Sequence, residues 1–334
     1  MASSTLTADE QTFQRIVSDF GRRRFGLGLA AAGLGVALAG CSTDEAKSSA
    51  DVSDAFPFAY STETVDVPRD PQRVVSIQGR ADLEFGLLAG YPMIASGASF
   101  LPNEPVGVQF GSLVPNELPR IGLGDGIDVD YEQLLGLEPD LILVPSYGYK
   151  VDWYGNDRLR QIAPVAPISD NFIGWREDLT AQLSVLGRAG VGPELFADYH
   201  AAIASIRADL SRALSGKRVA MAAAGDGMIV VQHNGIQVDT AMDTGLLVPN
   251  FDPTVDGGLE LAQEDYDRLA DLDLMILQVN DGTGKVPELG PTWDALPFVR
   301  AGRVHVVDGR FNQGFVVTAT NFVSEIRTAA ALLS

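Results

Sequence analysis

Histidine and cysteine, the residues that most often hold metals or act as nucleophiles, are few and scattered in this chain. The three histidines are His200, His233 and His305, so no two of them have the close spacing of a zinc-binding HExxH helix. A single cysteine, Cys41, excludes an intrachain disulfide framework and a CxxC metal site. The sequence therefore predicts neither a protein-held metal nor a cofactor.

Two glycine-containing stretches approach nucleotide-binding motifs but lack necessary positions. The run Gly122–Gly126 has Ile127 where GxGxxG needs its third glycine, and no long strand precedes it. Lys285 follows a glycine as in a phosphate-binding loop, yet Val279 stands at the first glycine position and Val286 offers no hydroxyl for magnesium. Nucleotide binding is therefore not expected.

No GxSxG nucleophile elbow is present, which argues against a hydrolase of the Ser-His-Asp type. In α/β proteins the functional groups follow the carboxyl ends of strands. Here these positions hold neutral side chains such as Gln78, Tyr147 and Asn280, which suit binding more than bond breaking. The sequence predicts a binding protein and not an enzyme.

Length and charge limit the remaining classes. The chain has 334 residues, 46% of them hydrophobic, which is enough for packed cores and favours two lobes. Its 24 basic and 44 acidic residues give a formal net charge of -20. Nucleic-acid binding needs clustered Lys and Arg, so a nucleic-acid partner is not expected.

The first forty residues have the layout of an export signal. Arg22–Arg24 precede the apolar run Phe25–Ala39, which at 15 residues is too short to span a membrane. The paired arginines resemble a twin-arginine signal. The run ends in Leu-Ala-Gly-Cys, which resembles a lipoprotein lipobox with Cys41 as the acylated residue; the alternative is a buried free cysteine behind a weak anchor. Residues 41–62, polar and small at their start, are then a flexible tether to the extracytoplasmic face of the cell membrane.

The body of the chain alternates between strand and helix patterns. Arg73 begins the strand RVVSI, the helical pattern ADLEFGLLAG follows, and MIASG is another strand. Such alternation predicts a mostly parallel sheet covered on both faces. Residues 192–215 form the longest uninterrupted helical pattern. This predicts an α/β lobe over 63–191, a bridging helix over 192–215 and a second α/β lobe over 216–334.

The two halves also share a pattern. Glu132 precedes Leu137 by five residues, and Asp140 and an apolar strand follow. In the second half Glu264 precedes Leu269 by five residues, and Asp273 and a strand follow with one extra residue. The whole helix-to-strand pattern, more than any single pair, indicates a repeated architecture.

Several stretches together resemble one family. TWDALPFVRAGRVHVVDGRFNQG (292–314), PQRVVSI, IGLGDGIDVDYEQLLGLEPDLILVPS and AQEDYDRLADLDLMIL are similar to iron-siderophore substrate-binding lipoproteins, over about residue 65 to the C-terminus. The resemblance implies two Rossmann-like lobes joined by a single long rigid helix, the class III periplasmic-binding-protein architecture. It implies a ferric siderophore as ligand in the cleft between the lobes, with the iron held by the siderophore, and little lobe closure.

The ligand-binding residues follow from the strand-end loops and from the resemblance. Arg80 lies in the first such loop, and Arg, Tyr and Trp side chains suit a large, partly aromatic, often anionic ligand. The family's hydroxamate binders carry an arginine where Gly124 stands, so their pocket does not transfer whole. Arg80 could instead be a solvated charge and Trp175 a core residue, and Trp293 and Phe298 are expected in the core. The candidate ligand-binding residues are Arg80, Tyr147, Tyr149, Trp153, Trp175, Arg310, Phe311 and Gln313.

The resemblance also implies a partner, an ABC transporter permease dimer with its ATPase. A glutamate in each lobe of the family docks onto permease arginines, and Glu132 and Glu264 match these positions, with Asp265 as a substitute for Glu264. A carboxylate in the first turn of a helix also has a local explanation, since it complements the helix dipole. The protein is expected to act as a monomer.

Two alternatives remain open from the sequence. A haem- or cobalamin-binding receptor of the same fold would use an axial ligand such as His233 or a tyrosine. A secreted enzyme on a Rossmann-like scaffold is the alternative from another class. The missing nucleophile elbow and metal cluster argue against that enzyme.

Overall fold

The computed structural model describes most of the chain after residue 54. The described ranges are 55–60, 63–98, 104–114, 117–122, 129–171, 174–189, 192–225, 228–254, 258–280 and 282–333. The predicted signal, Cys41 and Gly124 lie outside them.

The first half of the chain builds a parallel sheet of four strands. The strand order is β4-β3-β5-β6, and each neighbouring pair is parallel. The alternating helices predicted from the sequence supply the crossovers. The strands are β3 (Val74–Ser76), β4 (Met93–Ser96), β5 (Leu141–Pro145) and β6 (Val165–Ile168), and the helices are α2 (Ala81–Leu88), η2 (Val108–Leu113), α3 (Tyr131–Gly136), α4 (Ser146–Lys150), α5 (Asn156–Ile162) and α6 (Trp175–Val185).

An antiparallel hairpin precedes this sheet. It joins β1 (Ala55–Tyr60) to β2 (Glu63–Pro68). The interval 41–62 therefore contains a strand where the sequence predicted tether alone. Apolar Phe56 and Phe58 alternate with other residues, and Phe58 is fully buried in the core, which explains why this segment is folded.

The second half builds a mixed sheet of five strands. The order is β11-β10-β7-β8-β9; β10 pairs in parallel with β7 and β11, whereas β8 is antiparallel to both of its neighbours. The mostly parallel expectation thus fails for β8 and β9. The elements are β7 (Val219–Gly225), β8 (Met228–Gln232), α8 (Ile236–Asp243), β9 (Gly258–Leu261), η4 (Gln263–Leu269), β10 (Leu274–Val279), α9 (Pro291–Asp294), α10 (Pro297–Arg300), β11 (Val304–Val307), η5 (Gly309–Phe311), α11 (Val316–Ala330) and η6 (Ala331–Leu333).

In both sheets an aspartate directly before one strand, β5 or β10, binds the backbone at the start of the neighbouring strand. The Asp140 carboxylate accepts hydrogen bonds from the backbone N–H groups of Gln72 and Arg73, directly before β3. The Asp273 carboxylate accepts one from Arg218, directly before β7. These aspartates are the ones that the sequence pattern paired, so the repeat has a structural counterpart.

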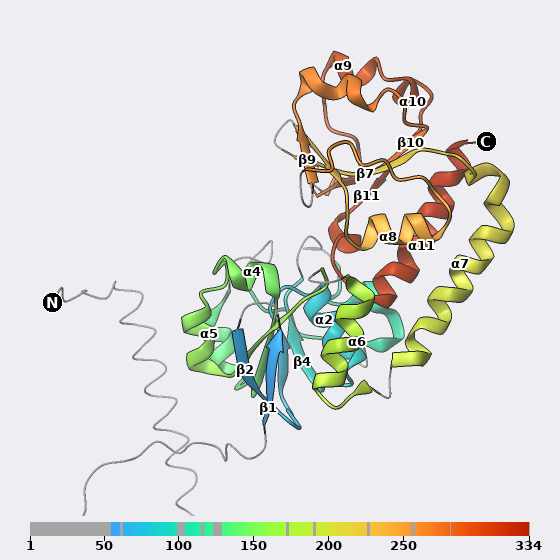
Figure 1. Cartoon of the computed structure of the whole chain (residues 1–334). Coiled ribbons are helices and arrows are strands. Elements are labelled where there is room, and N and C mark those ends of the chain that lie inside the picture. Colours follow the sequence, from blue (N-terminus) through green and yellow to red (C-terminus); the bar gives the residue numbers. More distant parts are fainter. Residues whose placement is uncertain are drawn as a thin grey trace, which may run out of the picture.

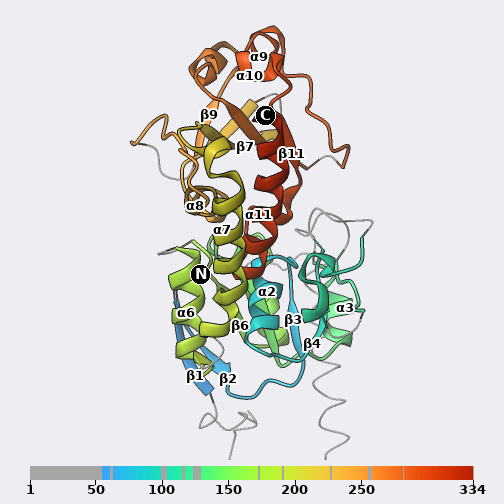
Figure 2. The ribbon, with the colours of Figure 1, turned by 90° about the vertical axis from the view of Figure 1, so that its right-hand side faces the viewer.

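One long helix runs between the two sheets. It is α7 (Gly192–Leu214), and Tyr199, Ile203 and Ile206, spaced by three or four, are buried along it. The C-terminal helix α11 packs beside α7, as Figures 1 and 2 both show. The connection predicted as a single helix is therefore made by two.

The core is continuous across the junction of the two sheets. One cluster of buried apolar side chains includes Val74 of the first sheet, Ile276 of the second, Ile206 of α7 and Phe322 of α11. The mixed α/β fold with two sheets and a shared core agrees with the predicted fold class. No helix within the described ranges is long and apolar enough to cross a membrane.

Candidate ligand-binding site

The loop after β3 is shaped by a buried aspartate. Asp82, in the first turn of α2, accepts hydrogen bonds from the backbone N–H groups of Gln78 at 2.7 Å and Arg80 at 2.9 Å. Burial raises the pKa of Asp82, although these N–H groups and the Arg80 charge oppose the rise. The carboxyl thereby fixes the backbone from which the Arg80 side chain leaves.

A glycine lets this loop pass against its neighbour. Gly79 has φ +80°, and a Cβ atom there would lie 2.1 Å from the carbonyl oxygen of Gly97. Only glycine allows that approach and that φ without strain. The position of Arg80 therefore depends on the residue before it as well as on Asp82.

Arg80 joins the two halves of the molecule. Its side chain is only 4% exposed, and Nη1 donates to Oδ1 of Asn312 in the loop after η5. Burial lowers its pKa to about 10, against the opposing effects of Tyr154, Asp170 and Asp82. The guanidinium is charged at neutral pH, and burial strengthens its attraction for an anionic or carbonyl oxygen.

Asp170, which follows β6, forms a second link across the junction. Its Oδ2 accepts the backbone N–H of Gly314 at 2.9 Å. Burial raises its pKa to about 7, while the Gly314 N–H and the Arg80 charge act in the opposite direction. The Asp170 carboxyl is thus poised between its neutral and charged forms near physiological pH.

Arg310 makes a third link. Its Nη2 lies 2.9 Å from Glu104 of the first half and 2.7 Å from Asp308 of the second. The Asp308 hydrogen bond, followed by the charges of Asp308 and Glu104, raises the pKa of Arg310. Two carboxylates therefore occupy the guanidinium that was expected to meet a ligand.

Tyr147 and Trp153 form an exposed aromatic pair beside the end of β5. The two rings meet edge to face with centroids 5.1 Å apart. Tyr147 is 53% exposed and Trp153 43% exposed. Exposed aromatic rings next to strand ends offer stacking and hydrogen bonding to a ligand.

Several buried polar atoms around Arg80 lack a hydrogen-bond partner among the described residues. They are Oε1 of Gln78, Oε1 of Gln109, the Tyr154 hydroxyl and Oε1 of Gln313. Gln109 also donates from Nε2 to the Gly79 carbonyl at 3.1 Å, which places it at the same loop. Buried polar groups are normally hydrogen-bonded, so these atoms suit a ligand rich in hydrogen-bonding groups.

Other candidate residues lie in the core. Tyr149 is buried, and its hydroxyl accepts a hydrogen bond from Arg160 at 2.6 Å. Trp175 is buried against Phe196 and Tyr199 of α7. Phe311 packs on Phe322 of α11. The structure thus places these three aromatic side chains away from the exposed surface, because helical neighbours cover them. Both ring nitrogens of His233 are covered as well.

Sequence reasoning missed the residues that hold Arg80. Asp82 and Asp170 resemble ordinary acids beside apolar segments, and Asn312 stands in a loop without periodicity. The available signal was their position, since all three stand within a few residues of a strand end or a short helix.

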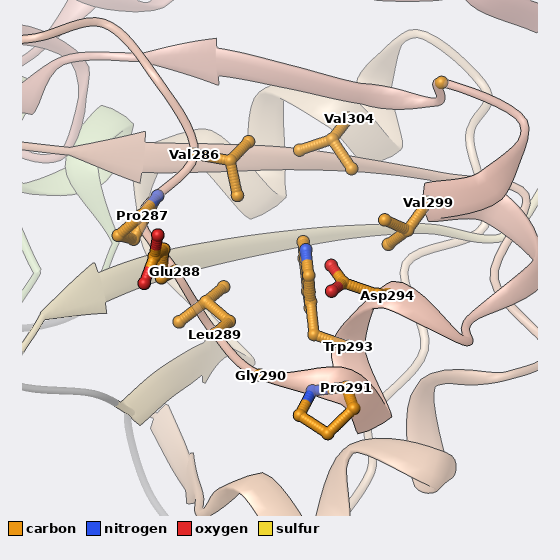
Figure 3. Close-up of a pocket in the computed structure, with 11 residues that line it drawn as sticks. Val286, Pro287, Glu288, Leu289, Gly290, Pro291, Trp293, Asp294, Val299 and Val304 are labelled. Atoms are coloured by element: carbon orange, nitrogen blue, oxygen red, sulfur yellow. The ribbon is translucent and has the colours of Figure 1, made fainter.

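One absence and two cavities among the described residues bear on function. No group of three or more His, Cys, Asp or Glu among them is placed to hold a metal ion. A cavity of about 310 Å³ lies beside Glu104 and is lined by Pro105, Glu117 and Arg120 among others. A cavity of about 640 Å³ lies beside α9 and α10 (Figure 3).

Comparison with known proteins identifies a family. The family model described as periplasmic binding protein matches residues 106–310, which is more than half of the chain. A search of curated proteins finds no match.

Solved structures share the fold at low sequence identity. The FhuD protein from S. pseudintermedius is 18% identical, with a TM-score of 0.62 over 83% of this chain and 97% of that one. A periplasmic binding protein component of a Fep/Fec-like ferrichrome ABC transporter from Bacillus subtilis is 18% identical, with a TM-score of 0.64 over 81% of this chain and 98% of that one. The Fe3+-Desferal-bound siderophore-binding protein FhuD from Vibrio cholerae is 20% identical, with a TM-score of 0.61 over 79% of this chain and 98% of that one.

Proposed function

This chain belongs to the periplasmic binding protein family, and from that membership we propose that it is an extracytoplasmic receptor that binds a ferric siderophore and delivers it to an ABC importer. Members of a binding-protein family bind ligands and do not catalyse. The similar solved structures include a ferrichrome transporter component and a protein with bound Fe3+-Desferal. Those names support the choice of ligand class.

The single observation that carries the proposal is the arrangement around Arg80. A buried guanidinium and unpartnered amide oxygens of Gln78 and Gln313 lie at the junction of the two halves, and a pair of exposed rings lies beside the end of β5. Hydroxamate and catecholate siderophores carry anionic oxygens, amide groups and apolar or aromatic surface. Such ligands match charge-assisted hydrogen bonding, amide acceptors and ring stacking respectively.

The ligand contacts proposed here are narrower than the set expected from sequence. Tyr147 and Trp153 are proposed to stack on the ligand, because both are exposed. Arg80 and Gln313 are proposed to bind the polar groups of the ligand. A ligand oxygen would then compete with Asn312 for the hydrogen bond from the Arg80 guanidinium. Asp170 is added because it lies within electrostatic reach of Arg80. Arg310 is proposed to act mainly through its ion pairs with Glu104 and Asp308.

Lipid anchoring and docking complete the proposal. Acylation of Cys41 after twin-arginine export would hold the protein at the outer face of the cell membrane. Glu132 and Glu264 support docking on an importer, since both side chains are exposed at the second positions of α3 and η4. Asp265 is exposed beside Glu264.

Tryptophan fluorescence tests the ligand. Ferrioxamine B, ferrichrome, a ferric tris-catecholate, haemin and metal-free desferrioxamine would be titrated into the mature domain, with Trp153 as the reporter near the site. One or more ferric siderophores should quench fluorescence at submicromolar concentration. The metal-free form should bind at least about tenfold more weakly, because only the iron complex is preorganised.

Variants locate the binding site. Tyr147→Ala should weaken binding about fivefold to 150-fold, the equivalent of about 1 to 3 kcal/mol. Val185→Ala, an exposed apolar position on α6, is the matched control and should leave the affinity unchanged. If haemin alone binds, the ligand is a haem and not a ferric siderophore. If Tyr147→Ala binds the ligand as tightly as the unmodified protein does, the aromatic pair is not part of the site.

A further inference from the structure

The cavity of about 640 Å³ lies away from the Arg80 site, in the second half of the molecule. Residues 286–291 form one wall, α9 lies at its centre, and α10 with the start of β11 forms the other wall (Figure 3). Figure 1 shows α9 and α10 on the side of the second sheet that faces away from the first half, and Trp293 and Phe298 pack there against Ala222 of β7. This volume falls in the range of small-ligand and peptide side-chain pockets.

Apolar side chains and two carboxylates line the cavity. Val286, Val299 and Val304 supply apolar surface, while Glu288 and Asp294 are exposed. None of the lining residues is Lys or Arg. The nearby Arg300 donates from Nε to the backbone oxygen of Asp294 at 3.3 Å. The lining therefore combines negative charge with apolar surface.

Trp293 adds a hydrogen-bond donor inside the cavity. Its ring is only 2% exposed and is held edge to face by Tyr266 and Phe298. Among the described residues the indole N–H donates no hydrogen bond, and its nitrogen is not one of the fully covered polar atoms. Figure 3 shows its nitrogen on the side of Val286 and Val304. The ring is thus buried while its N–H faces the cavity, where it can donate to a ligand carbonyl.

These features together select one chemistry. The carboxylates favour an ammonium or guanidinium group, the valines favour an apolar side chain, and the indole N–H favours a carbonyl oxygen. A simple organic cation offers the first of these alone. A peptide offers all three on consecutive residues.

We propose that this cavity binds a basic peptide segment of a protein partner, in which an apolar residue is followed by Arg or Lys. The carboxylates of Glu288 and Asp294 receive the basic side chain, and the Trp293 indole donates to the peptide backbone. The inference does not depend on what binds near Arg80.

A single-tryptophan protein gives a direct reading. The chain has three tryptophans, so Trp153→Phe with Trp175→Phe leaves Trp293 as the only reporter. The probes are the blocked peptides Ac-Gly-Leu-Arg-Gly-NH2 and Ac-Gly-Leu-Glu-Gly-NH2, and spermidine. The Arg peptide should change Trp293 fluorescence saturably and bind at least about tenfold more tightly than either other probe.

Two charge variants test the carboxylates in that background. Glu288→Gln with Asp294→Asn should weaken the Arg peptide at least about tenfold. Glu194→Gln with Asp198→Asn, two exposed acids of α7, should leave the affinity unchanged. If the single-tryptophan protein folds poorly, isothermal titration calorimetry of the unmodified protein with the same peptides measures their affinities instead.

The outcomes separate this inference from the proposed function. Equal binding of spermidine or of the Glu peptide, or no saturable binding by either method, would overturn the peptide site. Ferric siderophore binding is followed separately in Trp293→Phe, where Trp153 remains as reporter. Loss of one binding activity therefore leaves the other measurable.

Discussion

The carboxylate of Glu84 and the hydroxyl of Thr318 lie 2.6 Å apart although 234 residues separate them in the sequence. Glu84 is fully buried on α2, and Thr318 is in the first turn of α11. The same carboxylate accepts the backbone N–H groups of Phe315 at 2.8 Å and Val317 at 2.7 Å. An acid from the first half thus caps a helix of the second half.

Replacing Glu84 should destabilise the whole protein. In Glu84→Ala the N–H groups of Phe315 and Val317 and the Thr318 hydroxyl lose their acceptor in a buried place. We expect a loss of about 3 kcal/mol in the free energy of unfolding, measured by urea denaturation. The exposed Glu260→Ala on β9 should change stability by less than about 0.5 kcal/mol. Equal effects of the two changes would contradict this role of Glu84.

Asp170 should make stability depend on pH in a defined direction. Because burial raises its pKa from 3.8 to about 7, the folded state prefers the protonated carboxyl. Its contribution is present below about pH 4 and is lost as the pH rises through about 7. Asn cannot ionise, so the stability of Asp170→Asn relative to the unmodified protein should increase from about pH 4 to about pH 7 and then stay constant.

Urea denaturation of both proteins across that range measures the effect. The exposed Asp267→Asn is the control, and its stability should follow the unmodified protein at each pH. Parallel curves for Asp170→Asn and the unmodified protein would show that Asp170 ionises with an ordinary pKa.

Docking on an importer should depend on three exposed acids. Glu132→Ala, Glu264→Ala and Asp265→Asn together should leave siderophore affinity and melting temperature nearly unchanged, since all three side chains lie at the surface. Transport by cells, or stimulation of the importer's ATPase, should fall at least about tenfold because complementary charge sets orientation and encounter. Normal transport by the triple variant would remove these residues from the docking surface.

The lipid anchor should depend on Cys41. In Cys41→Ala the thiol that would be acylated is missing, so the protein should leave the membrane fraction or accumulate as an uncleaved precursor. Fractionation and immunoblotting measure both outcomes. A processed Cys41→Ala protein that stays with membranes would contradict lipidation at this residue.

Local patterns predicted the two halves and the long helix, but not the contacts between them. The spacing of Tyr199, Ile203 and Ile206 is visible in the sequence, and burial follows it. Glu84 stands within the helical pattern ADLEFGLLAG and resembles an exposed acid. Its burial depends on α11, more than two hundred residues later, and no local pattern contains that contact.

The same limit explains why the sequence did not indicate which candidate ligand-binding side chains are exposed and which are buried. Tyr147 and Tyr149 are two residues apart on α4, a helix of little more than one turn. Helical geometry points them in different directions, so one ring is exposed and the other is buried. Residue type identified the tyrosines as candidates, whereas the choice between them depended on how α4 packs against α5 and β5.

The capping of α11 by Glu84 also bears on the order in which the protein folds. During synthesis α2 leaves the ribosome long before residues 315–318, so the Glu84 carboxyl must wait in water for its partners. The contact also needs glycine at position 314, because a Cβ there would lie 2.6 Å from the Glu84 carboxylate. A nascent or truncated chain that ends before Phe315 lacks the ring that packs on Phe85. Such chains should be recognised by proteases, so that only proteins with a completed last helix persist.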